Sequence, residues 1–258
     1  MKSIEKDFNE VTKNWHNIYQ WTKCTKISYT EEISQLLLKQ FDLIKWTGDG
    51  LRKNKFKQDL HIGYCQIDKD PNQFMEKRFC RALFNISLEH FGKIIDYEVP
   101  LTEPKQGQGK KNHGDIDLLS QKENSLFFIE VKKHKSAESL LKAILEIFVY
   151  TYRLHHFKMI NSLKLDYGCS ESTTIVPAVL TFSDSRSGNQ IKEFYKYPEL
   201  QNLLKRINAE LNKEGIKNIE FYVVEEFIIE KALVSSLIRN KDYKIELSKP
   251  ISIKKYNI

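Results

Sequence analysis

Four charged residues lie at the start of one apolar segment and at the end of the next in HGDIDLLSQKENSLFFIEVKKHK, residues 113–135. Asp115 and Asp117 are one residue apart, as are Glu130 and Lys132. Because side chains alternate along a strand, each pair shares one face of its strand. If the two strands form a hairpin, Asp117 comes beside Glu130, and two close carboxylates repel unless a cation or a proton joins them. A hard divalent cation, Mg²⁺ or Mn²⁺, suits such oxygen ligands.

Lys132 adds a positive charge next to the expected cation site. Its amine could orient or deprotonate a water molecule, or neutralise charge developing on a phosphate. A divalent metal, a water molecule and a lysine together are typical of phosphodiester hydrolysis. Any one of these residues alone could be a charge at a strand end, but two such pairs on adjacent apolar strands favour a metal site.

The segments GDIDLL and FFIEVK resemble the signature of the PD-(D/E)XK nuclease superfamily, which is an Asp on one strand and an acid, any residue and Lys on the next. The resemblance covers residues 74–227 and implies a restriction-endonuclease-like fold in which Asp117, Glu130 and Lys132 are catalytic and the first two bind metal. It assigns Asp115 an auxiliary role.

Members of this superfamily also carry a Glu on the helix before the sheet, and Glu76 is the candidate for this catalytic and metal-binding role, with Glu89 as a weaker substitute. The expected helix places Glu76 on the same stripe as three apolar residues, Phe79, Cys80 and Leu83. Many members have a Gln in the helix after the Lys, where AILEIFVY instead carries Glu146, so this sequence departs from the pattern. Glu146 is expected to be an auxiliary residue or an extra ligand, or to face solvent.

The segments around this motif predict a mixed α/β layout about one sheet, with an antiparallel opening and a later crossover. The expected elements are a helix over 74–91, strands over 93–101, 115–121 and 125–133, a helix over 136–156 capped by Ser136, a strand over 173–183, a helix over 198–215 and a strand over 219–227. Residues 71–258 are therefore expected to form the nuclease-like domain. Residues 1–70 read as a mostly helical extension, with a helix over 30–44 begun by Thr30 as N-cap.

Composition places the chain among globular proteins with a basic character. The 258 residues are 41% hydrophobic and 29% charged, with a formal net charge of +7. Such an excess of positive charge suits a nucleic-acid partner, although many lysine-rich proteins bind none. Four scattered cysteines without a CxxC pair predict reduced thiols and no zinc site. The absence of an apolar signal core or a membrane-length run predicts a cytoplasmic protein with no membrane partner.

Basic side chains near the motif are the expected nucleic-acid contacts. They are Lys105, Lys110, Lys111, Lys133 and Lys135, with Arg52 and Lys53 in the extension. The main hypothesis is a Mg²⁺-dependent deoxyribonuclease acting in restriction or defence, in repair, or at transposon ends. The alternatives are a nuclease acting on RNA or branched DNA, and a catalytically silent DNA-binding or scaffold module of the same fold. The extension could recognise the substrate, a partner protein or a second copy of the chain.

Overall fold

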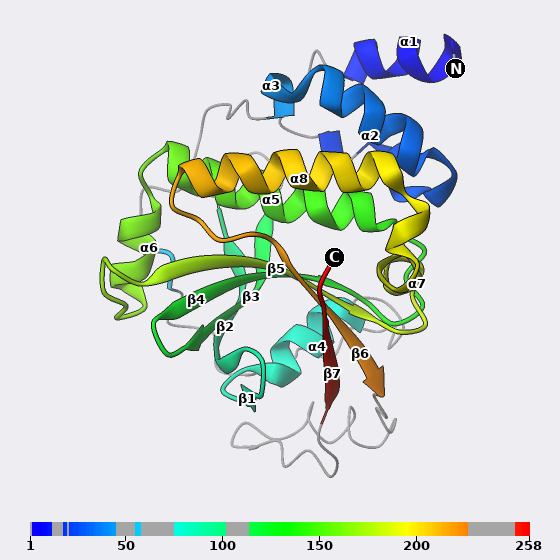
Figure 1. The fold of residues 1–258 in the computed structure, drawn as a ribbon. Coiled ribbons are helices and arrows are strands. Elements are labelled where there is room, and N and C mark those ends of the chain that lie inside the picture. Colours follow the sequence, from blue (N-terminus) through cyan, green and yellow to red (C-terminus); the bar gives the residue numbers. More distant parts are fainter. Residues whose placement is uncertain are drawn as a thin grey trace, which may run out of the picture.

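The computed structural model describes residues 2–11, 18–19, 21–44, 55–57, 75–101, 114–226 and 251–258. N-terminal helices are followed by four consecutive strands, and helices then precede each of the next two strands (Figure 1). In chain order they are α1 (Lys2–Val11), η2 (Thr22–Thr25), η3 (Ile27–Tyr29), α2 (Thr30–Lys39), α3 (Phe41–Ile44), α4 (Met75–Leu83), β1 (Ser87–Leu88), β2 (Gly92–Pro100), β3 (Asp115–Lys122), β4 (Ser125–Lys132), α5 (Leu140–His156), α6 (Ile160–Asp166), β5 (Thr174–Phe182), α7 (Arg186–Lys192), η4 (Phe194–Lys196), α8 (Pro198–Lys213), β6 (Glu220–Glu226) and β7 (Ser252–Tyr256).

The strands form one seven-stranded mixed sheet in which spatial order follows chain order, β1 to β7. The pairs β1–β2, β2–β3 and β3–β4 are antiparallel. The pairs β4–β5 and β5–β6 are parallel, and β7 is antiparallel to β6. Helices α5 and α8 lie on the two connections between parallel strands, because a parallel pair needs a long crossover. The predicted α/β class, antiparallel opening and later crossover are confirmed.

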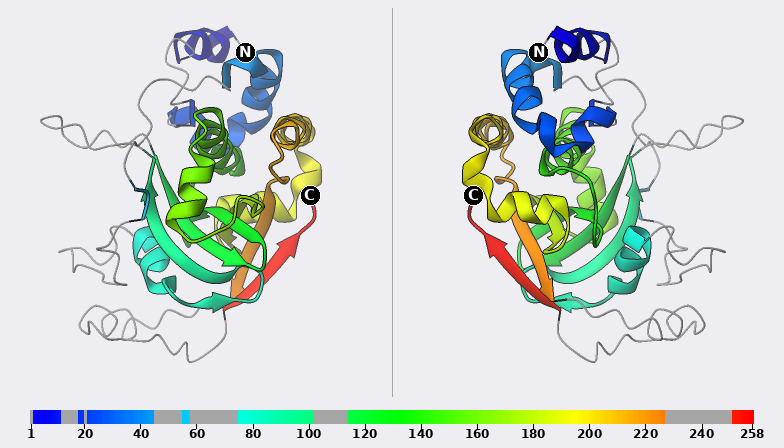
Figure 2. Two further views of the ribbon diagram at one scale, coloured as in Figure 1. Left: turned by 90° about the vertical axis from the view of Figure 1, so that its left-hand side faces the viewer. Right: turned by 90° about the vertical axis from the view of Figure 1, so that its right-hand side faces the viewer.

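Helices cover both faces of the sheet (Figure 2). On one face Leu126 and Phe128 of β4 belong to the same buried cluster as α5, α8 and α2. On the other face Phe127, Ile129 and Val131 pack with the apolar side of α4. Strand β4 therefore buries side chains on both faces, which explains its nearly continuous apolar sequence.

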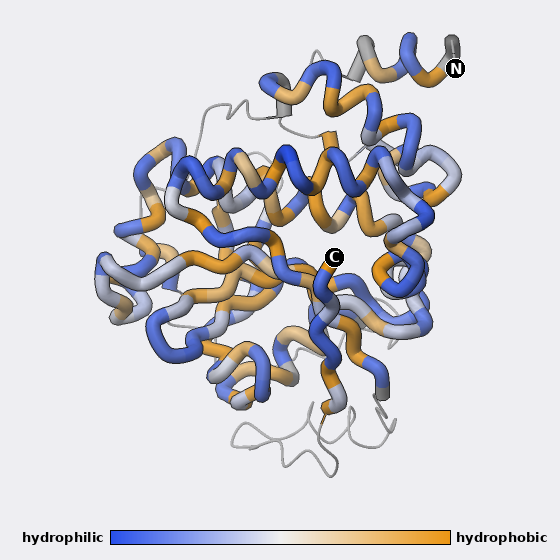
Figure 3. Tube along the Cα trace, in the orientation of Figure 1, coloured by the Kyte–Doolittle hydropathy of each residue, from blue (hydrophilic) through white to orange (hydrophobic). Residues whose placement is uncertain are grey.

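The N-terminal helices form a further layer outside α5 and α8. Helix α2 packs along α8, and Phe41 of α3 lies 6.0 Å from Phe148 of α5 between ring centroids. In Figure 3 hydrophilic and hydrophobic residues alternate along α8, which lies between solvent and this core. Buried apolar residues of the described N-terminal part, Ile4 and Phe8 among them, belong to the cluster on the α5 side of the sheet.

The helix predicted over residues 74–91 is shorter than expected. It ends at Leu83, and Asn85 takes a left-handed backbone with φ 65, a conformation that Asn tolerates. The chain then enters β1 and returns at Gly92. Leu88 and Phe91 continue the helical apolar spacing in the sequence, but they pack into the same cluster from β1 and from the turn after it.

Two predicted helix starts are also corrected. Ser139, not Ser136, caps α5 by accepting the N–H of Lys142, whereas Ser136 accepts the N–H of Glu138 in the preceding loop. Thr30 is the first residue of α2 rather than its cap, and its hydroxyl instead accepts a hydrogen bond from Gln190. Periodicity did not reveal β1, α6, α7 and β7, because each has at most seven residues.

None of the helices in the described part of the chain is both long enough and apolar enough to span a membrane.

The layer between β4 and α5 gives the first prediction. Phe128 is fully buried in the cluster on the α5 side. Phe128→Ala should lower the free energy of unfolding by about 3–5 kcal/mol, because it leaves a cavity in a close-packed layer. Urea unfolding measures this change. Leu165→Ala is the control, since Leu165 is 64% exposed and its truncation should matter little. Equal effects of the two substitutions would contradict this assignment of the core.

A candidate active site where the sheet forks

Strands β3 and β4 separate at one end, and the chemistry predicted from the sequence lies in the fork. Their antiparallel pairing stops at Leu118 and Ile129. Strand β3 continues beside β2 as far as Asp115, while β4 continues beside β5 as far as Lys132. Asp117 is the first residue of β3 beyond the ladder, and its Oδ2 accepts the N–H of Val131 at 2.8 Å. The fork thus turns the Asp117 carboxylate toward the end of β4.

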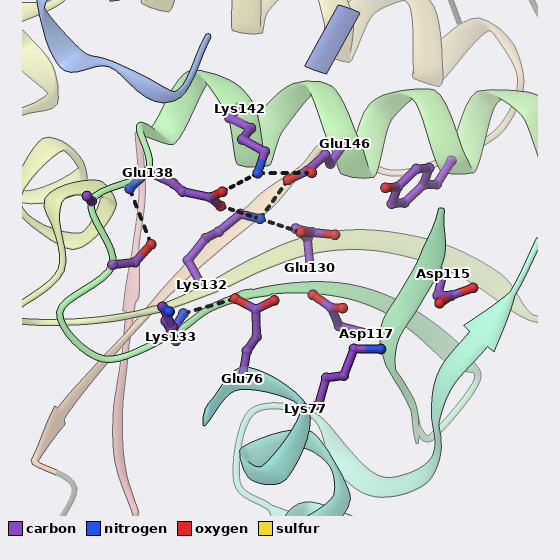
Figure 4. A pocket seen from close by; sticks show the side chains of 13 residues that line it. Glu76, Lys77, Asp115, Asp117, Glu130, Lys132, Lys133, Glu138, Lys142 and Glu146 are labelled. Atoms are coloured by element: carbon purple, nitrogen blue, oxygen red, sulfur yellow. Dashed lines mark hydrogen bonds and ion pairs between the residues drawn. The ribbon is translucent and has the colours of Figure 1, made fainter. Parts of the chain in front are cut away.

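A pocket of about 520 Å³ opens at this fork (Figure 4). It lies between the ends of β3 and β4, the first turn of α4 and the start of α5. Its lining is mostly charged: Glu76, Lys77, Asp115, Asp117, Glu130, Lys132, Lys133, Ser136, Ala137, Glu138, Lys142, Glu146 and Tyr150. Six carboxylates face four lysines, so the pocket is acidic within a basic protein.

Lys132 is the centre of the hydrogen-bonded network. Its Nζ lies 2.6 Å from Glu130 Oε1 and 2.6 Å from Glu146 Oε2. It lies 3.1 Å from Glu138 Oε2. An ammonium has three N–H donors, so these three carboxylates can take all of them. Only 2% of Lys132 and 4% of Glu130 are exposed.

Glu76 reaches the pocket from the first turn of α4. Its Oε2 accepts the N–H of Lys133 at 3.3 Å. The three apolar residues predicted to share its stripe, Phe79, Cys80 and Leu83, are all buried against the sheet. The helix is thereby fixed on the sheet by its apolar face, and its acidic first turn projects toward the fork (Figure 4).

Burial and mutual repulsion raise the pKa of the carboxyl groups at the fork. Desolvation is the main cause of the raised pKa of Asp117, and Glu76 adds to it, while Lys132 and the N–H of Val131 oppose it. Desolvation followed by Asp117 raises the pKa of Glu130. The pKa of Glu76 is also raised, again chiefly by burial. Ionisation of these carboxyl groups is therefore unfavourable unless a cation lies beside them.

The neighbouring charges have the opposite effect on Lys132. Burial acts to lower its pKa, but Glu130, Glu146, Glu138 and Glu76 together raise the pKa well above its usual value. The site thus holds Lys132 as a cation. Burial likewise acts to raise the pKa of Glu138, but Lys132 and Lys142 lower it, so Glu138 is held as an anion.

The structure brings together most of the residues predicted from the sequence. Those lining the pocket are Glu76, Asp115, Asp117, Glu130, Lys132, Lys133 and Glu146. Asp117 and Glu130 are on neighbouring strands, as predicted. Lys135 is exposed outside the pocket, and its N–H donates to Asp184. Glu89 lies on the turn after β1 and is not part of the pocket lining. Five predicted residues lie outside the described residues: Arg52, Lys53, Lys105, Lys110 and Lys111.

Sequence reasoning missed Lys77 and Glu138. Lys77 follows Glu76 directly, and its Nζ lies 3.4 Å from Glu98 of β2. Glu138 precedes the helix cap Ser139 and forms an i,i+4 ion pair with Lys142. That spacing is visible in the sequence, but it reads as an ordinary surface pair until α5 is placed against β4.

Tyr150 forms the pocket wall near β3. A Cβ added to Gly114, which has φ 103, would lie 2.3 Å from the Tyr150 ring. The glycine before Asp115 thus permits a close approach of the backbone to the aromatic ring. Lys142 and Tyr150 are each four residues from Glu146 in α5, so the three share one side of the helix, and this side faces the pocket.

Within the residues that the structure describes, no three His, Cys, Asp or Glu side chains form a ready metal-ligand set. Glu130 is turned toward Lys132, as described above. Comparisons of the chain with protein-family models, with curated proteins and with solved structures find no match.

The raised pKa of Asp117 gives a prediction that does not depend on any activity. The neutral carboxyl stabilises the fold below its unfolded-state pKa of about 3.9, and this contribution is lost as pH rises through the raised folded-state value. Near neutral pH the folded state must hold a repelled charge or bind a proton, and both lower stability. Asp117→Asn keeps an acceptor for Val131 without the charge.

Asp117→Asn should therefore raise the melting temperature near pH 8, and the gain should shrink toward pH 4. Thermal unfolding across this range measures it. Glu171→Gln removes an exposed carboxylate and should leave the melting curve unchanged. A variant that is less stable than the parent at pH 8 would show that the ionised Asp117 does not destabilise the folded state.

Proposed function

We propose that this chain is a metal-dependent nuclease of the PD-(D/E)XK type that hydrolyses phosphodiester bonds in DNA. The observation that carries the proposal is the convergence of Asp117, Glu130, Lys132 and Glu76 in one pocket at the fork of a mixed sheet. Three of these residues come from two strands and the fourth from the preceding helix. This is the arrangement that the resemblance to the superfamily implies.

The donor set suits Mg²⁺ or Mn²⁺. Asp117, Glu130 and Glu76 would hold the ion through carboxylate oxygens, which hard divalent cations prefer. Burial raises the pKa of all three carboxyl groups, so a divalent cation beside them would favour their ionised form. A bound divalent ion supplies Lewis acidity toward a phosphate oxygen and a more acidic water molecule.

The residues of the chain itself supply orientation and charge. The N–H of Val131 holds the Asp117 carboxylate at the fork. Lys132 presents a fixed positive charge beside Glu130, where charge would develop on a phosphate. Lys133, which is exposed and lines the pocket, and Lys135 just outside it can contact phosphates of the nucleic acid without reading its bases.

The decisive test compares cleavage with binding. Asp117→Asn should abolish cutting of plasmid DNA in Mn²⁺, because a ligand charge is lost, while DNA binding in Ca²⁺ persists or tightens. Lys132→Ala should retain Mn²⁺ binding and lose cutting by about 10²-fold or more. Asp115→Asn should cost less than Asp117→Asn.

Each variant is first checked by thermal unfolding, and supercoiled, linear, single-stranded, branched and RNA substrates are tried in parallel. Cleavage of only RNA or only branched DNA would change the substrate in the proposal. Wild-type cutting by folded Asp117→Asn or Lys132→Ala protein would refute this active site. Binding of DNA without cleavage or a Mn²⁺ site in the parent protein would instead support the silent module.

The exposed lysines after β4 give a separate prediction about binding. Lys133→Gln with Lys135→Gln should weaken DNA binding and reduce the slope of log affinity against log salt by up to about 1.8, because each lost phosphate contact releases fewer counterions. Lys254→Gln with Lys255→Gln, on β7 and outside the pocket lining, removes the same charge as a control. An equal change in slope for both pairs would place the phosphate contacts elsewhere.

A further inference from the structure

Glu138 stands outside the superfamily signature, yet it contacts both lysines of the inner pocket. Its Oε2 lies 3.1 Å from Lys132 Nζ, and its Oε1 accepts a hydrogen bond from Lys142 Nζ. Its own N–H donates to Ser136 Oγ at 3.2 Å. The backbone of Glu138 is thereby anchored in the loop while its carboxylate bridges the two ammonium groups.

The three carboxylates around Lys132 differ in what else they are expected to do. Glu130 is a proposed metal ligand, so its oxygens have a second use in the reaction. Glu146 comes from the middle of α5 and is 10% exposed at its side chain. Glu138 comes from the loop before α5 and its side chain is 30% exposed, which makes it the outermost of the three.

We propose that Glu138 is a positioning residue that holds the Lys132 ammonium toward the pocket. This inference rests on the proposed function. Glu146 and Glu138 contact the ammonium from α5 and from the loop, on the far side of Lys132 from its own strand. Without Glu138 the ammonium keeps only two partners, one of which is shared with the metal site.

Lys142 makes the arrangement specific to a carboxylate. It contacts Glu138 and lies 3.6 Å from Glu146 Oε1. If residue 138 is neutral, Glu146 is the one carboxylate that both lysines still contact, Lys142 through Oε1 and Lys132 through Oε2. A carboxylate at 138 therefore supplies one acceptor oxygen to each lysine, and glutamine offers a single oxygen without charge.

The experiment pairs a kinetic and a structural readout on Glu138→Gln, with Glu171→Gln as the matched surface control. Because the Lys132 charge is expected to act in the transition state, the turnover of DNA cleavage should fall by about 10- to 100-fold, while KM stays within about twofold of the parent. Lysine labelling with acetic anhydride, read by peptide mass spectrometry, should show a several-fold faster modification of Lys132. Both values should stay at parent levels in Glu171→Gln.

A second variant tests whether loss of Lys142 alone exposes Lys132. Lys142→Met leaves Glu138 to Lys132 alone, so labelling of Lys132 should not rise in this variant. Faster labelling in Lys142→Met to the same degree as in Glu138→Gln would mean that general loosening of the pocket, not the carboxylate of Glu138, exposes Lys132, and would overturn the proposal. All variants are compared at equal folded fraction, measured by thermal unfolding.

The remaining outcomes are also decisive. Unchanged Lys132 labelling in Glu138→Gln overturns the inference, as does faster labelling with parental turnover. A raised KM with unchanged turnover would make Glu138 a binding residue and also overturn it. If the parent protein cleaves no substrate, the proposed function fails, and the labelling result alone still decides whether Glu138 holds Lys132.

Discussion

The ammonium of Lys132 lies at the end of β4, a strand that is buried on both faces, and the rest of the site is arranged around that charge. An unpaired ammonium in such a position would be strongly destabilising, so it must be paired or lose its proton. Glu130 reaches it from the same face of β4, and Glu138 and Glu146 reach it from the α5 side. The position of α5 above β4 is therefore constrained by charge as well as by the apolar contacts beneath it.

This pairing does not use up the negative charge of the site. Asp117 and Glu76 stand on the other side of the fork. After burial, Glu76 is the largest cause of the raised pKa of Asp117, while Glu138 and Glu146 add to the burial that raises the pKa of Glu76. The sheet maintains this excess because its core holds the backbone rigidly: β4 has partners on both sides up to Ile129, and apolar clusters cover both of its faces. Where β3 leaves β4, the ladder no longer takes up the Val131 N–H, and Asp117 accepts it instead. One local change in pairing thus places a carboxylate and opens the pocket.

The strands and the central charges were predictable from sequence, since strand alternation and the hairpin signal act over a few residues. The pairing of Asp117 with the end of β4 followed from them. Glu138 could not be recognised in the same way, because its partner Lys132 is reached only after the loop over residues 133–139 brings α5 back over the strand. The overlong helix prediction had a related cause: Leu88 and Phe91 kept helical spacing while packing from outside the helix. Contacts that depend on chain reversal leave no periodic signal.

The N-terminal segment takes part in building the site wall as well as the outer layer. Tyr19 packs edge-on against Tyr150, with ring centroids 5.4 Å apart. The carbonyl of Cys24 accepts the hydroxyl of Ser139, the residue that caps α5. One contact is at the N-cap of α5, next to the pocket residue Glu138, and the other is at Tyr150, the pocket residue that lies against Gly114. Because α5 also carries Lys142 and Glu146, the described N-terminal residues pack on the same helix that supplies two charged side chains to the pocket.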